Sequence, residues 1–478
     1  MTPNRRPRSA PNDRELRLWK VGRALTLAFA AAVLVAGGVF YFLVDLLDVK
    51  EIGATAKLDA KTLFDLVKLS FGVVAGAGAL VALVVAYRRQ RVDEAGAHRE
   101  ATRLHTERFS QAVDKLGSDS PAVRLGGVHA LAGLADDAPD NNLRQTCIDV
   151  LCAYLQLPYT PDPGTDPTHQ EEHHHYLALR KVRHTILRLI GDHYRRPQET
   201  HRSWQGCDLD LTDITIDGSM DFSGARFSGG DVNFSGAIFS GGTVDFSGAR
   251  FSSGDVNFSG AILSGGTVSF SRARFLGSEV DFSKAAFSGS TVNFNQAIFS
   301  EELPFSDGRL NFHRTTFSGG ELSFNGAIFA GGSVHYGGEV NFYRATFSGT
   351  EVSFSGATFS GSKINFSGAR FCGSTVVFSE TTVSGSTKFS RGEVLFSGAA
   401  FSGGRVFFSG AAFSGGTVDF SGTAFSGGTV VFSSAAFSGG TVVFSDATGP
   451  APHGLLATVG TSAPPGVVLS SAWLPPVT

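Results

Sequence analysis

The sequence predicts an all-β solenoid, formed by the second half of the chain and preceded by two transmembrane helices and a small α-helical region. Three observations predict this organisation. A twelve-residue pattern recurs between residues 207 and 446, two long stretches near the N-terminus carry no charge, and helical periodicity fills residues 88–200.

The composition departs from that of an ordinary globular protein. Among 478 residues, 59 are glycine and 42 are phenylalanine, while only 17% are charged. The formal net charge of −3 provides no global attraction for nucleic acid or for anionic lipid. The four cysteines, Cys147, Cys152, Cys207 and Cys372, form no CxxC pair, so neither a disulfide framework nor a zinc site is indicated.

Two uncharged stretches predict a membrane anchor. Residues 24–44 (ALTLAFAAAVLVAGGVFYFLV) and residues 69–87 (LSFGVVAGAGALVALVVAY) are each long enough to cross a bilayer as a helix. A cleaved signal peptide is the alternative for the first stretch, but such peptides have an apolar region of only about 7–15 residues. Gly72 and Gly76 in the second stretch suit close helix packing, either within the hairpin or between two copies of the chain.

The basic residues around these stretches predict an orientation. Seven lie in the N-terminal segment 1–23, and Arg88, Arg89 and Arg91 follow the second stretch, whereas the loop 45–68 mixes lysines with acids. By the positive-inside rule both termini are cytoplasmic and only the short loop is outside. The expected location is therefore the cell inner (plasma) membrane, as a multi-pass protein with the lipid bilayer as a partner.

Residues 88–200 form a predicted cytoplasmic helical region. A charged helix runs to about Leu116, Ser120 and Pro121 suit the N-cap and first residue of the next, and further helices are expected near 143–155 and 171–195. The consecutive histidines 173–175 point about 100° apart on a helix, so they are not expected to bind one metal ion.

Two further histidines in this region, His184 and His193, are nine residues apart. This is the wrong interval for one helical face. They are predicted to lie on the surface.

The repeat carries two interleaved series of phenylalanines, each with a period of twelve residues, as in VNFSGAIFSGGT (232–243). Within a strand, residues two apart point the same way, so V-x-F and A-x-F predict inward pairs, and the following S-G and S-G-G predict corners. If equivalent segments stack about 4.8 Å apart, the rings form a core. The expected core ladder contains Phe222, Phe227, Phe234, Phe239, Phe246, Phe251, Phe258, Phe420, Phe425, Phe432, Phe437 and Phe444.

Interruptions of the repeat are multiples of six residues, which indicates that the chain counts the sides of a coil. Phe294 to Phe312 and Phe378 to Phe396 are both 18, and Tyr336 to Phe342 is 6. A four-sided coil of about 24 residues and a three-sided coil of about 18 residues both satisfy this count. The four-sided count predicts about ten coils and a rod about 50 Å long.

The stretch DFSGARFSGG (221–230) and its copies resemble the pentapeptide-repeat family, and the preceding CDLDLTDITIDGSMDF (207–222) looks like a first coil. The resemblance implies a right-handed quadrilateral parallel β-helix. Together with the paired spans and the helices before the repeat, it suggests a bacterial membrane-anchored member. The chain departs from the family by two extra residues per pair of units. After the solenoid, the segment 447–478 loses the repeat and is expected to be either a cap or a disordered tail.

Three classes of function follow from these features. A membrane-anchored, non-enzymatic scaffold that presents the solenoid to an unknown protein partner at the cytoplasmic face is favoured, because repeat solenoids are extended binding surfaces. A nucleic-acid mimic is the first alternative, but residues 221–446 carry 16 acids against 13 basic residues, far from the charge density of DNA. A flat-face ligand-binding solenoid is the second.

An enzyme is not expected. No GxSxG elbow, Walker loop, HExxH motif or paired-carboxylate signature occurs, and the serines recur at corners. Neither a cofactor, nor a metal, nor nucleic acid is predicted as a partner. A homo-oligomer is possible.

Overall fold

The computed structural model describes most of the chain from residue 60 onward. The described residues are scattered positions between 26 and 41, then 60–300, 309–330, 337–360, 362–384, 392–427, 429–437, 440–452, 455–459 and 466–474. The chain divides into two compact units, Met1–Arg103 and Leu104–Thr478.

The predicted membrane location is wrong. Among the described residues, no helix combines the length and the apolar character that crossing a bilayer requires. The second predicted span, 69–87, is part of α2 (Ala60–Leu116), which continues into the charged residues after Tyr87. The predicted inner-membrane, multi-pass location with both termini cytoplasmic is overturned by this finding.

The structure does not describe most of the other parts of the predicted anchor. Most of the first predicted span, 24–44, lies outside the described residues, as do the segment 1–23 and the first part of the loop 45–68.

The second unit begins with the end of α2 and three further helices, α3 (Pro121–Asp136), α4 (Asn141–Gln156) and α5 (Gln170–Arg195). A short 3-10 helix, η2 (Pro167–His169), precedes α5. Pro121 occupies the first turn of α3, and the Asp140 side chain caps α4 by accepting a hydrogen bond from the Leu143 N–H at 2.9 Å. The helices share a core with the solenoid, in which Val128, Ile148 and Ile186 are fully buried.

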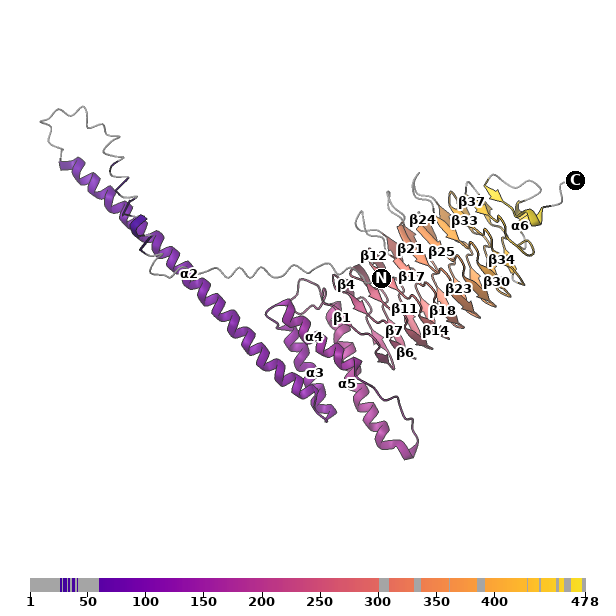
Figure 1. Ribbon diagram of the computed structural model, residues 1–478, viewed down its shortest axis with the longest axis horizontal. Coiled ribbons are helices and arrows are strands. Elements are labelled where there is room, and N and C mark those ends of the chain that lie inside the picture. Colours follow the sequence, from indigo (N-terminus) through magenta and orange to yellow (C-terminus); the bar gives the residue numbers. More distant parts are fainter. Residues whose placement is uncertain are drawn as a thin grey trace, which may run out of the picture. The chain divides into compact units, whose positions relative to one another are not determined.

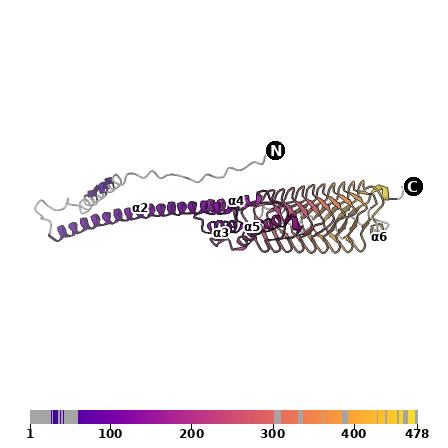
Figure 2. The ribbon, with the colours of Figure 1, turned by 90° about the horizontal axis from the view of Figure 1, so that it is seen from below.

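The solenoid consists of four parallel sheets, and each coil of the chain contributes one strand to each sheet in turn (Figures 1 and 2). The first sheet contains β1 (Leu209–Asp210), β5 (Val232–Asn233), β9 (Val256–Asn257), β13 (Glu279–Asp281), β17 (Arg309–Asn311), β21 (Gly337–Asn341), β25 (Ser362–Asn365), β29 (Glu393–Leu395), β33 (Thr417–Asp419), β37 (Thr441–Val443) and β38 (Val467–Val468). The second contains β2 (Thr215–Ile216), β6 (Ile238–Ser240), β10 (Ile262–Ser264), β14 (Ala286–Ser288), β18 (Thr316–Ser318), β22 (Thr346–Ser348), β26 (Arg370–Cys372), β30 (Ala400–Ser402) and β34 (Ala424–Phe425).

The other two sheets complete the four sides. The third contains β3 (Met220–Asp221), β7 (Thr243–Asp245), β11 (Thr267–Ser269), β15 (Thr291–Asn293), β19 (Glu321–Ser323), β23 (Glu351–Ser353), β27 (Thr375–Val377), β31 (Arg405–Phe407) and β35 (Thr429–Val431). The fourth contains β4 (Arg226–Ser228), β8 (Arg250–Ser253), β12 (Arg274–Leu276), β16 (Ile298–Ser300), β20 (Ile328–Ala330), β24 (Thr358–Ser360), β28 (Thr382–Ser384), β32 (Ala412–Ser414) and β36 (Ala436–Phe437).

Strand pairing decides the size of the coil. Val232 pairs with Val256 and Val256 with Val280, so one coil takes 24 residues. It has four sides, and the three-sided alternative is excluded. Longer steps of 30 residues occur, as from Val280 to Leu310. The six extra residues always fall in the connection from the fourth sheet to the first, in which 301–308, 331–336 and 385–391 lie outside the described residues. The interruptions therefore lengthen one corner and do not add a side.

One half-coil shows why the sequence folds this way. In residues 243–254 the inward side chains are Val244, Phe246, Ala249 and Phe251, all buried. The chain turns between Phe246 and Ala249, where the Ala249 N–H donates to the Phe246 carbonyl at 3.0 Å. Gly248 has a φ of 67°, the left-handed conformation that the third residue of such a turn requires.

Both ends of the solenoid are covered. At the start, α5 packs on β3 and β4, and the ring of Tyr194 lies 5.1 Å from that of Phe227. At the other end, β38 extends the first sheet, and the ring of Trp473, in the 3-10 helix η3 (Ser471–Trp473), lies 5.3 Å from that of Phe444. A short helix, α6 (Leu455–Val459), lies at the same end (Figure 1). These elements protect coil edges that could otherwise pair with another chain.

Candidate binding surfaces

The interior of the solenoid is filled by columns of phenylalanine. Rings of successive coils stack nearly parallel, as in Phe234 and Phe258, whose centroids are 4.9 Å apart at an angle of 4°. Of the twelve residues expected in the core ladder, eleven are at most 3% exposed. The twelfth, Phe437, lies in β36. Because these side chains pack against one another, they hold the fold and are not accessible to a ligand.

The outer faces carry the residues that flank these inward side chains. In the third sheet, Thr243, Thr267 and Thr291 follow one another in register, one per coil. Part of the outer polar set has a structural role, because its side-chain oxygens cap the turns. The Oδ1 atoms of Asn233 and Asn257 accept hydrogen bonds from the N–H groups two residues later, at 3.0 and 2.8 Å.

An acidic column runs along the corner between the fourth and first sheets. The Asp231 N–H donates to Asp208 Oδ1, the Asp255 N–H to Asp231 Oδ1 and the Glu279 N–H to Asp255 Oδ1, each at 3.1 Å. Burial, followed by the charges of Asp281 and Asp255, raises the pKa of Glu279. The like charges are thus offset by hydrogen bonds that link one coil to the next.

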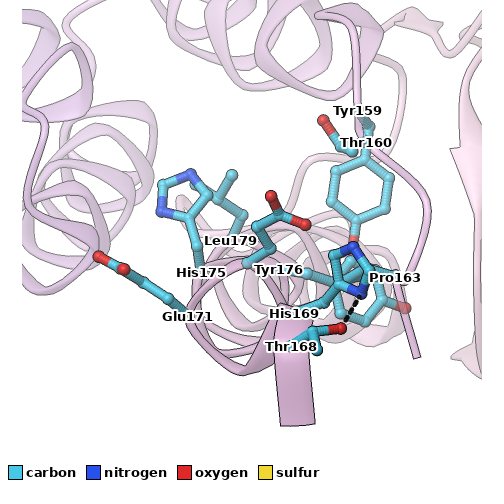
Figure 3. Close-up of a pocket in the computed structure, with 10 residues that line it drawn as sticks. Tyr159, Thr160, Pro163, Thr168, His169, Glu171, His175, Tyr176 and Leu179 are labelled. Carbon is cyan, nitrogen blue, oxygen red and sulfur yellow. Dashed lines mark hydrogen bonds between the residues drawn. The ribbon is translucent and has the colours of Figure 1, made fainter. Parts of the chain in front are cut away.

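The helical region contains an open cavity of about 610 Å³ (Figure 3). It lies between the proline-rich loop before η2 and the first turns of α5. Its walls are formed by Tyr159, Thr160, Pro163, Thr168, His169, Glu171, Glu172, His175, Tyr176 and Leu179. In Figure 3 the rings of Tyr159 and Tyr176 lie on one side of the opening, while Glu171 and His175 lie on the other.

Asp217, just after β2, binds the two cavity tyrosines. Its carboxylate accepts hydrogen bonds from the hydroxyls of Tyr159, at 3.0 Å, and Tyr176. Arg180 Nε and His184 Nε2 on α5 each lie 3.2 Å from its oxygens. Burial acts to raise the pKa of Asp217, but the hydrogen bonds from His184, Tyr176 and Tyr159 and the charge of Arg180 outweigh it and lower that pKa to about 2.

This arrangement suits anchoring better than catalysis. Burial and the neighbouring carboxylate raise the pKa of the Tyr159 phenol, so both tyrosines remain protonated hydrogen-bond donors. The contacts that Asp217 makes join α5 and the loop to the first coil. Within the part of the chain that the structure describes, no group of three or more His, Cys, Asp or Glu side chains is placed to hold a metal ion.

A second network corrects the predicted surface position of His193. This residue is only 2% exposed, and its ring stacks on that of Trp204 with centroids 4.0 Å apart. Its Nε2 lies 3.0 Å from Asp136 Oδ1, which also accepts a hydrogen bond from Trp204 Nε1 at 3.1 Å. His184 is likewise engaged, with Asp217. The sequence signal for burial was the indole of Trp204, which needs an acceptor when it is buried.

Comparison with known families finds the one described as pentapeptide repeats (9 copies), which matches residues 204–250, 222–274 and 342–393. Over these residues the chain is similar to pentapeptide-repeat proteins. The matched residues lie in the solenoid, or directly before it, and the buried Phe246 and Phe251 are the central residues of two successive pentapeptide repeats. The predicted resemblance is confirmed at this level, whereas a membrane anchor and a bacterial origin are not shown.

The other comparisons add little to the pentapeptide-repeat assignment. No curated protein matches the chain. Among solved structures, a similar one is "Structure of QnrB1 (Full length), a plasmid-mediated fluoroquinolone resistance protein", with 17% sequence identity, covering 48% of this chain and 90% of that chain. Its TM-score is 0.18, so this likeness carries no argument here.

Proposed function

We propose that this chain is a non-enzymatic scaffold whose pentapeptide-repeat solenoid binds a protein partner through its outer faces. The observation that carries the proposal is the filled interior. Because the phenylalanine columns leave no room for a ligand inside, whatever the solenoid binds must contact the side chains outside. Those side chains stand in straight columns, one coil apart, on a backbone that is paired throughout in parallel sheets.

The chemistry of the three buried cysteines supports a role without catalysis. Burial raises the pKa of the thiols of Cys147 and Cys152 to about 12 and that of Cys207 to about 11. These thiols are therefore not ionised at neutral pH. The tyrosines at the cavity are held as donors to Asp217, as described above.

Charge favours a protein partner over nucleic-acid mimicry. Eleven strands in the first sheet give ten steps of about 4.8 Å, a rod of about 48 Å. A duplex of that length carries about 28 negative charges, at about one per 1.7 Å, whereas residues 221–446 have a net charge of −3. The outer columns also mix small, charged and aliphatic residues, which does not suit a uniform flat ligand surface.

The test uses the full-length chain with an affinity tag to capture partners from the cell of origin. One variant per sheet places arginine at three successive outward positions, for example Thr243→Arg, Thr267→Arg and Thr291→Arg in the third sheet. A control variant, Glu171→Arg with Glu172→Arg, alters the cavity alone. We expect one protein to be captured in a stoichiometric amount and to be lost with one face variant only. A partner that all four face variants retain, and that the cavity variant loses, would contradict the proposal.

A further inference from the structure

At the corner between the first and second sheets, three successive coils carry a cationic residue. Where the chain turns from the first sheet to the second, five of the ten coils have glycine in the left-handed conformation, as at Gly236, Gly260 and Gly368, and the first and last have Asp213 and Asp446. In three successive coils this position holds Lys284, Arg314 and Arg344 instead. We call these three residues the basic column.

The basic column has a hydrogen-bonded backbone and exposed side chains. Its residues have φ values of 60°, 57° and 57°, a conformation that disfavours any residue with a Cβ atom. The Lys284 N–H donates to the His313 carbonyl at 2.9 Å and the Arg314 N–H to the Tyr343 carbonyl at 3.0 Å, so the backbone fixes the register between coils. All three side chains are exposed. Local structure would be served better by glycine, so the fold does not explain the charges.

The residues directly before the basic column also depart from the repeat. Serine precedes the corner in most coils, but His313 and Tyr343 stand there in two successive coils, and their rings stack 5.5 Å apart at an angle of 8°. The guanidinium of Arg344 lies over the Tyr343 ring, 5.1 Å from its centroid. Two flat rings therefore flank the cations on the surface.

Within the described part of the solenoid, no ion pair neutralises the charges of the basic column. None of its residues has an ion-pair partner among the residues that the structure describes. Burial lowers the pKa of His313, and the charges of Arg314, Arg344 and Lys284 lower it further, against an opposing effect of Asp281. The Asp281 carboxylate is engaged by the Ser283 N–H at 2.8 Å.

The first sheet beside this corner shows a different pattern. Its outward residues in the same region alternate in sign from coil to coil, in the order Glu279, Arg309, Glu339 and Lys363. Alternating charges in adjacent strands attract one another, whereas three cations in successive coils repel. Neither the backbone conformation nor the electrostatics of the described residues therefore explains why three cations stand at these positions.

We propose that the basic column binds an acidic helix of a protein partner, lying along the solenoid axis. This inference rests on the proposed function and names the chemistry of the partner. Successive coils at this corner are 4.9 to 5.1 Å apart, as measured between the stacked rings of Phe282, Phe312 and Phe342. One turn of an α-helix rises about 5.4 Å, so carboxylates at positions i, i+4 and i+7 match three successive cations.

Nucleic acid fits the column less well. Phosphates recur about every 3.4 Å along one strand of a duplex, which does not match the coil spacing. The cations also cover only three coils of a solenoid whose net charge is negative. The flanking rings suit either the apolar edge of a helix or a base, so the experiment must separate the two.

The test measures fluorescence anisotropy of a labelled helical peptide of about 20 residues with the full-length chain. The probe peptide carries glutamate at i, i+4 and i+7 on one face, and a second peptide has the same composition with the glutamates distributed around the helix. The main variant is Lys284→Gly, Arg314→Gly and Arg344→Gly, which restores the repeat residue and suits the left-handed backbone. The matched control is Arg226→Gln, Arg250→Gln and Arg274→Gln, since these arginines stand in register in three coils of the fourth sheet.

We expect the main variant to bind the probe peptide at least about tenfold more weakly than the unmodified chain, with a midpoint of thermal unfolding that is equal or higher. The control variant should bind within about twofold, and the distributed peptide should bind weakly to all three proteins. Equal losses in both variants would overturn the proposal, as would tighter binding of a single-stranded oligonucleotide or of anionic vesicles at the same corner. A partner captured as described above, but retained by the glycine variant, would overturn this inference and leave the scaffold proposal standing.

Discussion

An inward phenylalanine in the solenoid contacts phenylalanines of its own column and of the neighbouring ones, as Phe312 shows. Phe312 lies 5.1 Å from Phe282 and 4.9 Å from Phe342 in parallel stacks, and 6.3 Å from Phe294 edge-on. Offset and edge-on pairs add to the free energy gained by burying the ring. Natural exceptions occur at Leu263 and Val383, which take equivalent positions in the columns of the second and fourth sheets.

Removal of one ring tests the column. Phe312→Ala should lower the free energy of unfolding by about 3–5 kcal/mol, because the flanking rings are held by their own coils and cannot close the cavity. Phe312→Leu, which copies the exception at Leu263, should cost less, about 1 kcal/mol. Both are measured by denaturant unfolding followed by circular dichroism. Equal losses for the two substitutions would show that the position requires the aromatic ring itself and not only buried apolar volume.

At this scale the sequence predicts the interior well and the polar contacts poorly. The phenylalanine periodicity is local, so it reveals which side chains point inward. The partners of His193 and Asp217 come from other elements, namely Asp136 on α3 and Tyr159 before α5. Such distant pairs leave no spacing to detect. The basic column is visible in the sequence as S-K, H-R and Y-R in place of S-G, but its alignment in space depends on the coil length.

Among the elements, α5 decides how the helical region meets the solenoid. Gly191 on α5 faces β3, and a Cβ added there would lie 2.3 Å from the Asp221 carbonyl oxygen. Nothing lies within 4 Å of a Cβ added at Gly133 on α3. The two glycines therefore offer a matched pair of substitutions.

Gly191→Ala should destabilise the chain by about 1–3 kcal/mol, because α5 must move away from the first coil. Gly133→Ala should instead stabilise it by about 0.5–1 kcal/mol through its higher helix propensity. Thermal unfolding followed by circular dichroism at 222 nm compares them. A gain at both positions would mean that α5 does not press against β3.

The pH dependence of this junction follows from Asp217. Its pKa is about 2 in the folded chain and 3.8 when unperturbed, so its stabilising effect is fully present above about pH 4 and is lost as the pH falls toward about 2. Asp217→Asn should lower the free energy of unfolding by about 2 kcal/mol at pH 7 and flatten the acid dependence between about pH 4 and pH 2.

Acid titration of this variant is read against Asp119→Asn, which changes an exposed aspartate outside the junction. If the Asp217 and Asp119 variants lose stability with acid in the same way as the unmodified chain, Asp217 does not hold the junction.

The sequence predicted the positions of α3 and α5 well, but it predicted a membrane span within α2. The N-cap and proline signals before α3 and the apolar spacing of α5 are local, and both helices form as expected. The predicted membrane location was wrong, because the uncharged run 69–87 is part of one long helix and no described helix meets the requirements for crossing a bilayer. Continuation of α2 into the charged segment shows that one helix can include both kinds of sequence.

For the whole molecule, the length of one coil is the quantity that the sequence left open. A count in multiples of six fits both three and four sides, and only strand pairing distinguishes them. The same pairing explains why extra residues are accepted at one corner, since they lengthen a connection without shifting any inward side chain.

Deletion of one coil tests this architecture. Removing residues 256–279 joins Asp255 to Val280 and keeps every sheet in register, so the chain should fold with a solenoid shorter by about 4.8 Å. Removing only residues 256–261 takes away one side and should prevent cooperative folding of the coils that follow. Small-angle scattering and thermal unfolding measure both. A well-folded six-residue deletion would contradict the four-sided coil.

Because the coils stack in parallel, each outer face is built from residues that are far apart in the sequence. Neighbours along the axis, such as Lys284, Arg314 and Arg344, lie a full coil apart in the chain, and these coils are the long ones. Overlapping linear fragments, as used on peptide arrays, will therefore never reproduce a face that three coils build together. An antibody raised against such a face should recognise the native chain and ignore every short fragment of it.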